Sequence, residues 1–327
     1  MNILLTGGAG YIGSHVILAL LDNGHSVSVI DDLSTGHKDL LPDNIQFLEC
    51  NINNKNKVAS LIKQNNFDAL MHFAAFIKVE ESIKNPEKYF TNNTDNAINL
   101  FKTCFENNLK NIIFSSTAAA YGNPETNINI PETEILRPLN PYGESKIKTE
   151  KFLLQNKDRF KFIILRYFNV AGADPSLRTG LISKNATHLI KITSEVAVGK
   201  REKVTIFGND YNTPDGTAIR DYIHVSDLAD IHLKAMEYLI SNKKSNIFNC
   251  GYGKGYSVKE VVDITNKITG GTIKFKYGKR RLGDAENLVS DISKFHQYID
   301  WTPRYNNLST IIETAINWER KLNAKNL

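Results

Sequence analysis

A glycine-rich turn at the start of the chain constrains its fold more than any other feature. Residues 6–13 read Thr-Gly-Gly-Ala-Gly-Tyr-Ile-Gly and follow the apolar residues Ile3, Leu4 and Leu5. Glycines at such a point let a strand turn tightly into a helix and let the backbone approach a pyrophosphate. The spacing is G-x-x-G-x-x-G rather than G-x-G-x-x-G. A dinucleotide-binding turn is the favoured interpretation, with a purely structural loop as the alternative.

Short apolar runs alternate with helical patterns through the first half of the chain. Strands are expected at residues 3–6, 26–31, 45–49, 69–74, 111–115 and 161–165, and helices near 13–23, 55–64, 86–107 and 141–155. This alternation is typical of an α/β fold with a doubly wound parallel sheet. Beyond Asn169 the pattern becomes more irregular. We therefore expect a Rossmann domain at 1–168 and a smaller mixed α/β substrate domain at 169–327, with some segments interleaved.

Composition excludes several classes of protein. The 327 residues suffice for about two domains of ~150 residues, and 41% hydrophobic with 23% charged residues is ordinary for a globular protein. The net charge of +5 comes from basic residues scattered among acids, which does not indicate nucleic-acid binding. Cys50, Cys104 and Cys250 form no Cys-x-x-Cys pair, so neither a disulfide framework nor a metal site is expected. Without a signal-peptide core or a run of ~18 apolar residues, the chain is expected to be cytoplasmic and not to bind membranes.

An acidic residue follows the glycine-rich turn at the distance that a dinucleotide site requires. Asp31 ends the second expected strand, about 20 residues after the turn, with Asp32 beside it. A carboxylate there accepts hydrogen bonds from the adenosine ribose and repels a 2′-phosphate. The pair predicts selection of NAD over NADP, unless the two residues merely open a loop.

Tyr142 and Lys146 lie one turn apart on a helix that Asn140 and Pro141 are expected to begin. A phenol is a poor base because its pKa is about 10, but a lysine at i+4 and a nicotinamide cation would both favour the phenolate. Thr117 follows the fifth expected strand, where open α/β sheets bind ligands. An isolated Tyr-x-x-x-Lys pair is usually inert surface. Together with the glycine-rich turn, these three residues predict proton exchange with a sugar or alcohol hydroxyl.

At these residues the chain resembles the UDP-hexose 4-epimerases of the extended short-chain dehydrogenase/reductase family. The resemblance runs nearly end to end and is carried by residues 6–15, 72–75, 81–82, 89–93, 115–122, 141–146, 166–172, 206–211, 215–217, 220–225 and 280–284. It implies a tightly held NAD, a homodimer and the interconversion of UDP-glucose and UDP-galactose through a 4-keto sugar. Tyr142 would remove the proton of the sugar 4-hydroxyl, Thr117 would hydrogen-bond that hydroxyl, and Lys146 would hold the nicotinamide ribose.

The resemblance also implies two sets of binding residues and no metal. Cofactor contacts are expected from Gly7, Gly10, Tyr11, Ile12, Gly13, Asp31, Asn51, Ile52, Phe73, Ala74, Ala75, Asn92, Ser115, Tyr142, Lys146 and Tyr167. Substrate contacts are expected from Thr117, Asn169, Asn185, Phe207, Arg220, Tyr222, Arg281, Asp284 and Leu288. Within the second set, the arginines would hold the diphosphate and the phenylalanine would form a wall for the uracil.

The chain departs from the family pattern at three positions. Asn51 stands where relatives usually place an aspartate toward the adenine, and its carbonyl can accept the same hydrogen bond. Ile77 stands where many epimerases have a lysine near the cofactor. Leu288 replaces a bulky tyrosine of glucose-specific relatives. The smaller side chain leaves room at the sugar C2 position, so UDP-N-acetylglucosamine and UDP-N-acetylgalactosamine are further expected substrates.

Three alternatives use the same scaffold. A nucleotide-sugar 4,6-dehydratase or decarboxylase needs acidic or polar groups after Thr117, and Ala118 and Ala119 cannot supply them. A reductase that releases NAD(P) in each cycle uses the same Thr, Tyr and Lys, so those residues do not exclude it. A cofactor-sensing protein without catalysis usually lacks the Tyr/Lys pair, which this chain retains.

Overall fold

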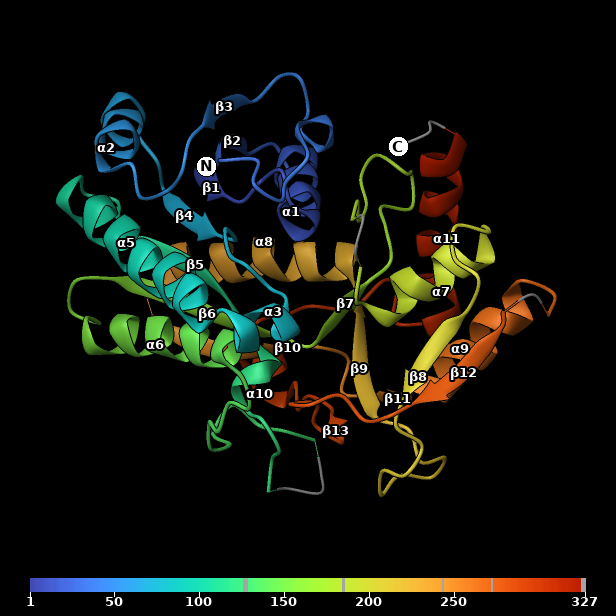
Figure 1. The fold of residues 1–327 in the computed structure, drawn as a ribbon. Coiled ribbons are helices and arrows are strands. Elements are labelled where there is room, and N and C mark those ends of the chain that lie inside the picture. Colours follow the sequence, from blue (N-terminus) through green and yellow to red (C-terminus); the bar gives the residue numbers. More distant parts are fainter. Residues whose placement is uncertain (126–128, 184–185, 243, 272, 325–327) are drawn as a thin grey trace.

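Seven parallel strands form the main sheet, in the order β10-β6-β5-β4-β1-β2-β3 (Figure 1). The computed structural model describes residues 1–125, 129–183, 186–242, 244–271 and 273–324. The strands are β1 Asn2–Thr6, β2 Ser26–Asp31, β3 Gln46–Glu49, β4 Ala69–His72, β5 Asn111–Thr117, β6 Lys161–Tyr167 and β10 Asn246–Cys250. The predicted α/β class and doubly wound parallel sheet are confirmed. The six expected strands all form, and β10 adds a seventh that was not expected.

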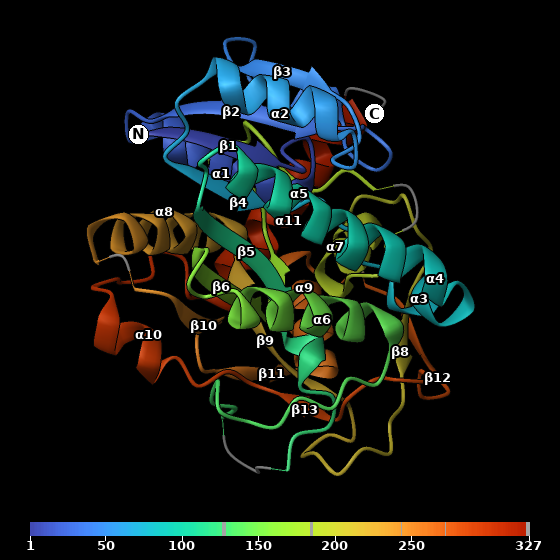
Figure 2. The same cartoon turned by 90° about the vertical axis from the view of Figure 1, so that its left-hand side faces the viewer.

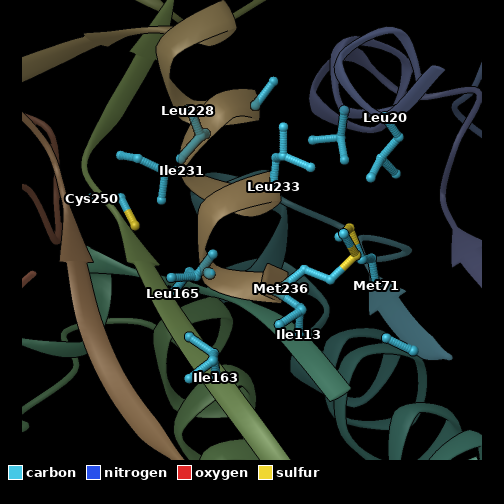
Figure 3. Close-up of a cluster of buried hydrophobic side chains, with 14 of the residues drawn as sticks. Leu20, Met71, Ile113, Ile163, Leu165, Leu228, Ile231, Leu233, Met236 and Cys250 are labelled. Carbon is cyan, nitrogen blue, oxygen red and sulfur yellow. The ribbon is translucent and has the colours of Figure 1, made fainter. Parts of the chain in front are cut away.

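Helices cover both faces of this sheet because side chains alternate along each strand. On β1, Ile3 and Leu5 face one side while Leu4 faces the other. The first face packs against α1 (Tyr11–Asp22) and α8 (Val225–Asn242), and the second packs against α2 (Lys55–Gln64), α5 (Asn96–Glu106) and α6 (Pro141–Gln155). Figure 3 shows Leu233 and Met236 of α8 against Met71 and Ile113 of the sheet. Each fully buried side chain of this size stabilises the fold by roughly 1.5–3 kcal/mol.

The order of the strands reverses between β1 and β4, which places a ligand crevice there. Along the chain, β1 is followed by β2 and β3 on one side, whereas β4, β5 and β6 continue on the other. In open α/β sheets the crevice lies beyond the carboxyl ends of the strands at such a switch point. The loops after β1, β4, β5 and β6 therefore meet at one edge of the sheet (Figure 2).

Smaller sheets and several helices lie beside the main sheet. One sheet contains β7 Asn169–Ala171, β9 Ile219–His224, β11 Gly255–Ser257 and β13 Asn287–Leu288, and β8 Val204–Phe207 pairs with β12 Phe275–Gly278. Helices α7 Leu189–Ala197, α9 Val258–Ile268 and α11 Leu308–Ala324 share an apolar core beside them, and α10 Ser293–Tyr298 packs on β10. Although β10 and α8 come from the second half of the chain, they belong to the main sheet and its covering. The division at residue 168 stays a prediction.

The helix expected at 86–107 contains an irregular turn. After α3 (Val79–Lys84), the segment runs through α4 (Pro86–Tyr89), a π-helical turn at Phe90–Asp95 and α5. Single π-helical turns are rare and frequently occur at functional sites. Here Asn93 within the turn binds both backbone groups of Phe76, at 2.9 Å each, and so fixes the loop that follows β4.

Candidate active site

The turn between β1 and α1 lies so close to the neighbouring backbone that its glycines are required. Gly7 has φ +76°, and a Cβ built there would lie 2.5 Å from the nitrogen of Ala74. A Cβ on Gly13 would lie 2.3 Å from the carbonyl oxygen of Gly7. Any larger residue at either position displaces backbone. The turn is thus held against the loop after β4, at the switch point of the sheet.

The N-terminus of α1 fits the pyrophosphate of a dinucleotide. Gly10 occupies the cap position, where no side chain of the described residues caps the helix, and the first turn carries no acidic residue. The first backbone N–H groups of a helix have no partner within it and favour anions. Tyr11 and Ile12 open the helix, and the Tyr11 hydroxyl donates to the carbonyl of Gly172 at 2.7 Å. This bond ties the turn to the segment after β7.

Asp31 is hydrogen-bonded to the glycine-rich turn. Its carboxylate accepts hydrogen bonds from the backbone nitrogens of Ala9, at 3.0 Å, and Leu33, at 2.9 Å. Burial raises the pKa of Asp31, and the two backbone hydrogen bonds oppose that rise. The carboxylate lies at the carboxyl end of β2, where the sequence predicts its contact with the adenosine ribose.

Asn51 joins this region through Asp32. The amide of Asn51 donates to Asp32 at 2.8 Å, and its carbonyl accepts from the backbone of Asn53 at 2.9 Å. Both ends of the side chain are therefore engaged within the loop, although a carbonyl keeps a second lone pair for an adenine amine. Ile52 is buried beside it.

Four more predicted cofactor residues lie in the loop after β4 and in the π-helical turn. Phe73, Ala74 and Ala75 follow β4 directly and are all partly buried. Asn92, in the π-helical turn, donates to Asn93 at 3.0 Å. Of these residues, Phe73 and Ala74 lie directly against Gly7 of the glycine-rich turn.

Tyr167 has its hydroxyl committed to a neighbouring helix. It donates to Nε2 of His232 at 2.5 Å, because Nδ1 of that histidine faces the carbonyl of Leu228 at 2.8 Å. Tyr167 is the last residue of β6, so its backbone lies at the carboxyl end of that strand. Beside it, the hydroxyl of Ser115 donates to the carbonyl of His72 at 2.6 Å and joins β5 to β4.

Helix α6 begins as the sequence predicts. The side chain of Asn140 accepts from the nitrogen of Gly143 at 2.9 Å, and Pro141 occupies the first turn. This cap sets the start of the helix, so Tyr142 and Lys146 face the sheet on one side of it.

Lys146 is buried with its ammonium on the backbone of β5. Its Nζ donates to the carbonyl of Ser115 at 2.8 Å, and only 3% of the residue is exposed. Burial lowers the pKa of Lys146 to about 7, against the opposing charge of Glu150. Its charge state is therefore balanced close to neutral pH.

Tyr142 meets Thr117 at the end of β5. Burial raises the pKa of Tyr142, and a side-chain hydrogen bond with Thr117 lowers it in part. The phenol ring also packs edge-on against Tyr89, with 6.5 Å between ring centroids. The protein groups alone thus keep the phenol neutral, whereas the sequence led us to expect a lowered pKa in the working site. The three predicted catalytic residues nevertheless lie together.

Arg220 is fixed by backbone carbonyls. Its guanidinium donates to Ala285 at 2.6 Å and to Ile219 at 2.8 Å, and the carboxylate of Asp284 lies 3.7 Å away. The residue is 9% exposed. It holds the loop before β13 in place, and its predicted contact with a diphosphate stays a prediction.

Arg281 is held less firmly. Its guanidinium lies 3.9 Å from the ring centre of Phe207, and Glu80 of α3 is 3.7 Å from its Nε. Among the described residues this Nε, although buried, has no hydrogen-bond partner. Next to it, a hollow of about 470 Å³ is lined by Ile83, Asn123, Leu139, Pro141, Leu282, Gly283 and Asp284. The hollow reaches the residue that precedes Tyr142.

The other predicted substrate residues fall into two places. Asn169 and Tyr222 are partners in the β7–β9 ladder, and both line a cavity of about 30 Å³ together with His188 and Lys191 of the adjoining segment. Leu288 packs on the apolar cluster that contains Ala118, Tyr121, Ile130 and Phe168, immediately beyond Thr117. Asn185 lies outside the described residues.

Sequence reasoning missed a polar cluster behind the catalytic residues. Glu150 lies one turn beyond Lys146 and binds Ser116 and Arg166, and all three are buried. The four-residue spacing of Tyr142, Lys146 and Glu150 was the available signal, since residues at i, i+4 and i+8 share one side of a helix.

The described residues contain neither a membrane-spanning helix nor a cluster of metal-binding side chains. No helix in this part of the chain is long and apolar enough to cross a membrane. Over the same ranges, no three His, Cys, Asp or Glu side chains gather as a metal site would require.

Comparison with known proteins gives consistent matches. The model of the NAD dependent epimerase/dehydratase family matches residues 3–251. A UDP-glucose 4-epimerase from Azospirillum brasilense is 44% identical over 323 residues, covering 98% of this chain and 92% of that protein. The UDP-Glc/GlcNAc 4-epimerase of Campylobacter jejuni is 45% identical, with a TM-score of 0.84 over 98% of this chain and 99% of that one. A UDP-glucose 4-epimerase from Bifidobacterium longum, solved with NAD+ and UDP, is 32% identical, with a TM-score of 0.91 and 98% of both chains covered.

Proposed function

The chain belongs to the NAD dependent epimerase/dehydratase family and has the activity of a UDP-glucose 4-epimerase, and we propose that Thr117, Tyr142 and Lys146 carry that activity. The observation that supports this assignment is their convergence at the end of β5. The side chain of Thr117 is close enough to Tyr142 to lower its pKa, and Lys146 is bound to the carbonyl of Ser115, two residues earlier on the same strand. This is the edge where the switch point of the sheet places a ligand.

Bound NAD+ supplies a hydride acceptor and a positive charge, and the residues supply proton transfer and orientation. Tyr142 would take the proton of the sugar 4-hydroxyl as C4 is oxidised to the ketone. Thr117 would hydrogen-bond the same oxygen and align it with the phenol. Tyr142 would give the proton back when C4 is reduced from its other face, so that the configuration at C4 is inverted with no net oxidation.

Lys146 adjusts the basicity of Tyr142 and holds the cofactor ribose. Burial raises the pKa of the phenol, so without assistance Tyr142 stays protonated near neutral pH and cannot accept a proton. A protonated Lys146 one turn away, in a poorly hydrated site, favours the phenolate. Asp31, at the end of β2, fits the adenosine ribose and disfavours a 2′-phosphate.

The substrate range extends to UDP-N-acetylhexosamines. Leu288 packs on the apolar cluster that includes Ala118, the residue after Thr117, which supports its proposed place near the sugar. A leucine there occupies less volume than a tyrosine, which leaves room for an acetamido group at C2. The 45% identity to an enzyme described as a UDP-Glc/GlcNAc 4-epimerase supports this range.

An assay with four UDP-hexoses and no added cofactor tests the activity and its range together. UDP-glucose, UDP-galactose, UDP-N-acetylglucosamine and UDP-N-acetylgalactosamine are incubated separately, and the C4 epimers are resolved. Each should yield its epimer. Epimers from the glucose pair alone would refute the wider range, and no epimer from any substrate would refute the catalytic assignment.

A variant at position 288 tests whether this one residue determines the substrate range. Leu288→Tyr should lower kcat/KM for UDP-N-acetylglucosamine at least tenfold and leave UDP-galactose within about threefold, since the larger ring competes only with the acetamido group. Leu288→Met is the matched control because it conserves volume and should change neither substrate.

Assembly and location complete the proposal. The family resemblance suggests a homodimer formed by helices that flank the main sheet, and α6 presents the exposed Leu154 for such a contact. Sedimentation equilibrium should give twice the mass of the chain, and Leu154→Glu should shift the mass toward the monomer.

The enzyme is proposed to be cytoplasmic, where nucleotide sugars and NAD are available, and fractionation of cells that express it checks this.

A further inference from the structure

Glu150 continues the row that Tyr142 and Lys146 begin on α6. The three residues are spaced by four positions and lie on one side of the helix. Only 1% of Glu150 is exposed, so its charge is removed from water and must be matched by the protein.

The carboxylate of Glu150 is matched by two neighbouring strands. Ser116 of β5 donates its hydroxyl to Oε1 at 2.5 Å. Arg166 of β6 donates from Nε to Oε1 at 3.1 Å and from Nη2 to Oε2 at 2.6 Å. Since Ser116 and Arg166 are register partners in the β5–β6 ladder, one side chain on the helix clamps two strands at the same level.

The far side of Arg166 is also fixed. Its Nη1 donates to the hydroxyl of Tyr121 at 3.0 Å and to the carbonyl of Glu132 at 3.1 Å. The hydroxyl of Tyr121 in turn donates to the side chain of Asn249 on β10 at 2.6 Å. The guanidinium therefore has little freedom, and Glu150 is anchored by a rigid partner.

Ser115 and Ser116 at the end of β5 each bind one member of the row on α6, and the next residue, Thr117, lies near the third. The carbonyl of Ser115 holds Lys146, the hydroxyl of Ser116 holds Glu150, and Thr117 meets Tyr142. A shift of α6 along the strand would disturb all of these contacts together. Glu150 lies two turns from Tyr142 on α6 and is almost fully buried, so it can set the register without touching substrate.

We propose that Glu150 is a positioning residue of the epimerase, which acts through Ser116 and Arg166 to hold α6 in register with the end of β5. The inference rests on the proposed function of Thr117, Tyr142 and Lys146. Because transition-state geometry is more sensitive to small displacements than substrate binding is, loss of the clamp should act on kcat more than on KM.

The test compares Glu150→Gln with Ser116→Ala and with the control Glu144→Gln. Glutamine keeps the length of the side chain but loses the charge that Arg166 requires. Alanine at 116 removes one hydrogen bond and leaves the Glu150–Arg166 pair intact, so that variant should fold normally. Glu144 lies on the same helix, is about half exposed, and pairs with Lys148, so its substitution should have no effect.

Kinetic constants are measured per chain that retains NAD, together with the urea midpoint of unfolding. Glu150→Gln should lower kcat at least tenfold and Ser116→Ala about threefold, with KM for UDP-galactose within twofold and NAD retained. Unchanged kcat in both variants would overturn the proposal, and so would a rise of KM in proportion to the fall of kcat. If the unmodified enzyme has no epimerase activity, the proposed function fails instead, which separates the two outcomes.

Discussion

The proposed catalytic residues on α6 and the arginine segment at 280–284 differ in how firmly the protein holds them. Lys146 is 3% exposed, with its ammonium 2.8 Å from a backbone carbonyl, whereas Arg281 lies on an aromatic ring with its nearest carboxylate 3.7 Å from Nε. Leu282, beside that arginine, is 82% exposed. The difference teaches that the groups proposed for chemistry are positioned by the fold, while the group proposed for binding keeps unused hydrogen-bonding capacity. Transition-state stabilisation benefits from such preorganisation.

The largest effect should come from the preorganised region. Tyr142→Phe should lower kcat by roughly a thousandfold, in the range of 10²–10⁴ that a proton-transfer group contributes, because the phenyl ring keeps the packing and removes the hydroxyl. Binding of UDP-glucose, measured by calorimetry, should change less than about threefold. Tyr298→Phe on α10 is the control, since its side chain is 46% exposed and lies outside the site. Full activity of the first variant would remove Tyr142 from the reaction.

The arginine segment should behave in the converse manner. Arg281→Ala should weaken UDP binding roughly 10- to 100-fold, as expected for loss of hydrogen bonds from a charged group, and change kcat less. Arg280→Ala is a matched control because Arg280 is bound to Asp210 at the surface. If the Arg281 variant instead lost kcat at unchanged affinity, the contrast between the two regions would be wrong.

A smaller effect should appear in the pH dependence of stability. Lys146 has a pKa of about 7 in the folded protein, compared with 10.5 when unfolded. Between these values the unfolded chain binds more protons, so the free energy of unfolding rises with pH through this residue. The slope is at most about 1.4 kcal/mol per pH unit for one group. Between pH 7 and 9, urea titration should show a steeper rise for the unmodified protein than for Lys146→Met.

Lys148→Met is the control for that comparison. Lys148 lies on the same helix, is about half exposed and pairs with Glu144. Its substitution should leave the slope unchanged. Equal slopes for the Lys146 variant and the unmodified protein would mean that the ammonium is not as deeply desolvated as the structure indicates.

Much of the fold could be predicted because it depends on local patterns. Patterns of a few residues are enough to predict the glycine-rich turn, the alternating strands and the Asn140-Pro141 start of α6. Each of them forms as expected. The seventh strand could not be predicted in the same way. Residues 246–250 join β6 only after the chain has left and returned, and nothing local to that segment indicates the pairing.

In the candidate site, too, the features that depend on local sequence could be predicted and those that depend on distant contacts could not. The positions of Thr117, Tyr142 and Lys146 follow from the strand end and the helix spacing, and they do converge. The partners of Arg220 and the clamp around Glu150 depend on contacts between distant segments, so sequence spacing alone could not give them. The pKa of Tyr142 likewise depends on burial, which outweighs the hydrogen bond from Thr117.

The central claim is that a hydride removed from C4 returns to the same carbon of the same sugar, while Tyr142 accepts and returns the proton of the 4-hydroxyl. UDP-galactose that carries deuterium at C4 tests it most directly, when incubated with the enzyme in ordinary water and an excess of free NAD+. We expect UDP-glucose with the deuterium retained at C4 and no label in the free cofactor pool. Deuterium lost to solvent or recovered in free NADH would contradict the account.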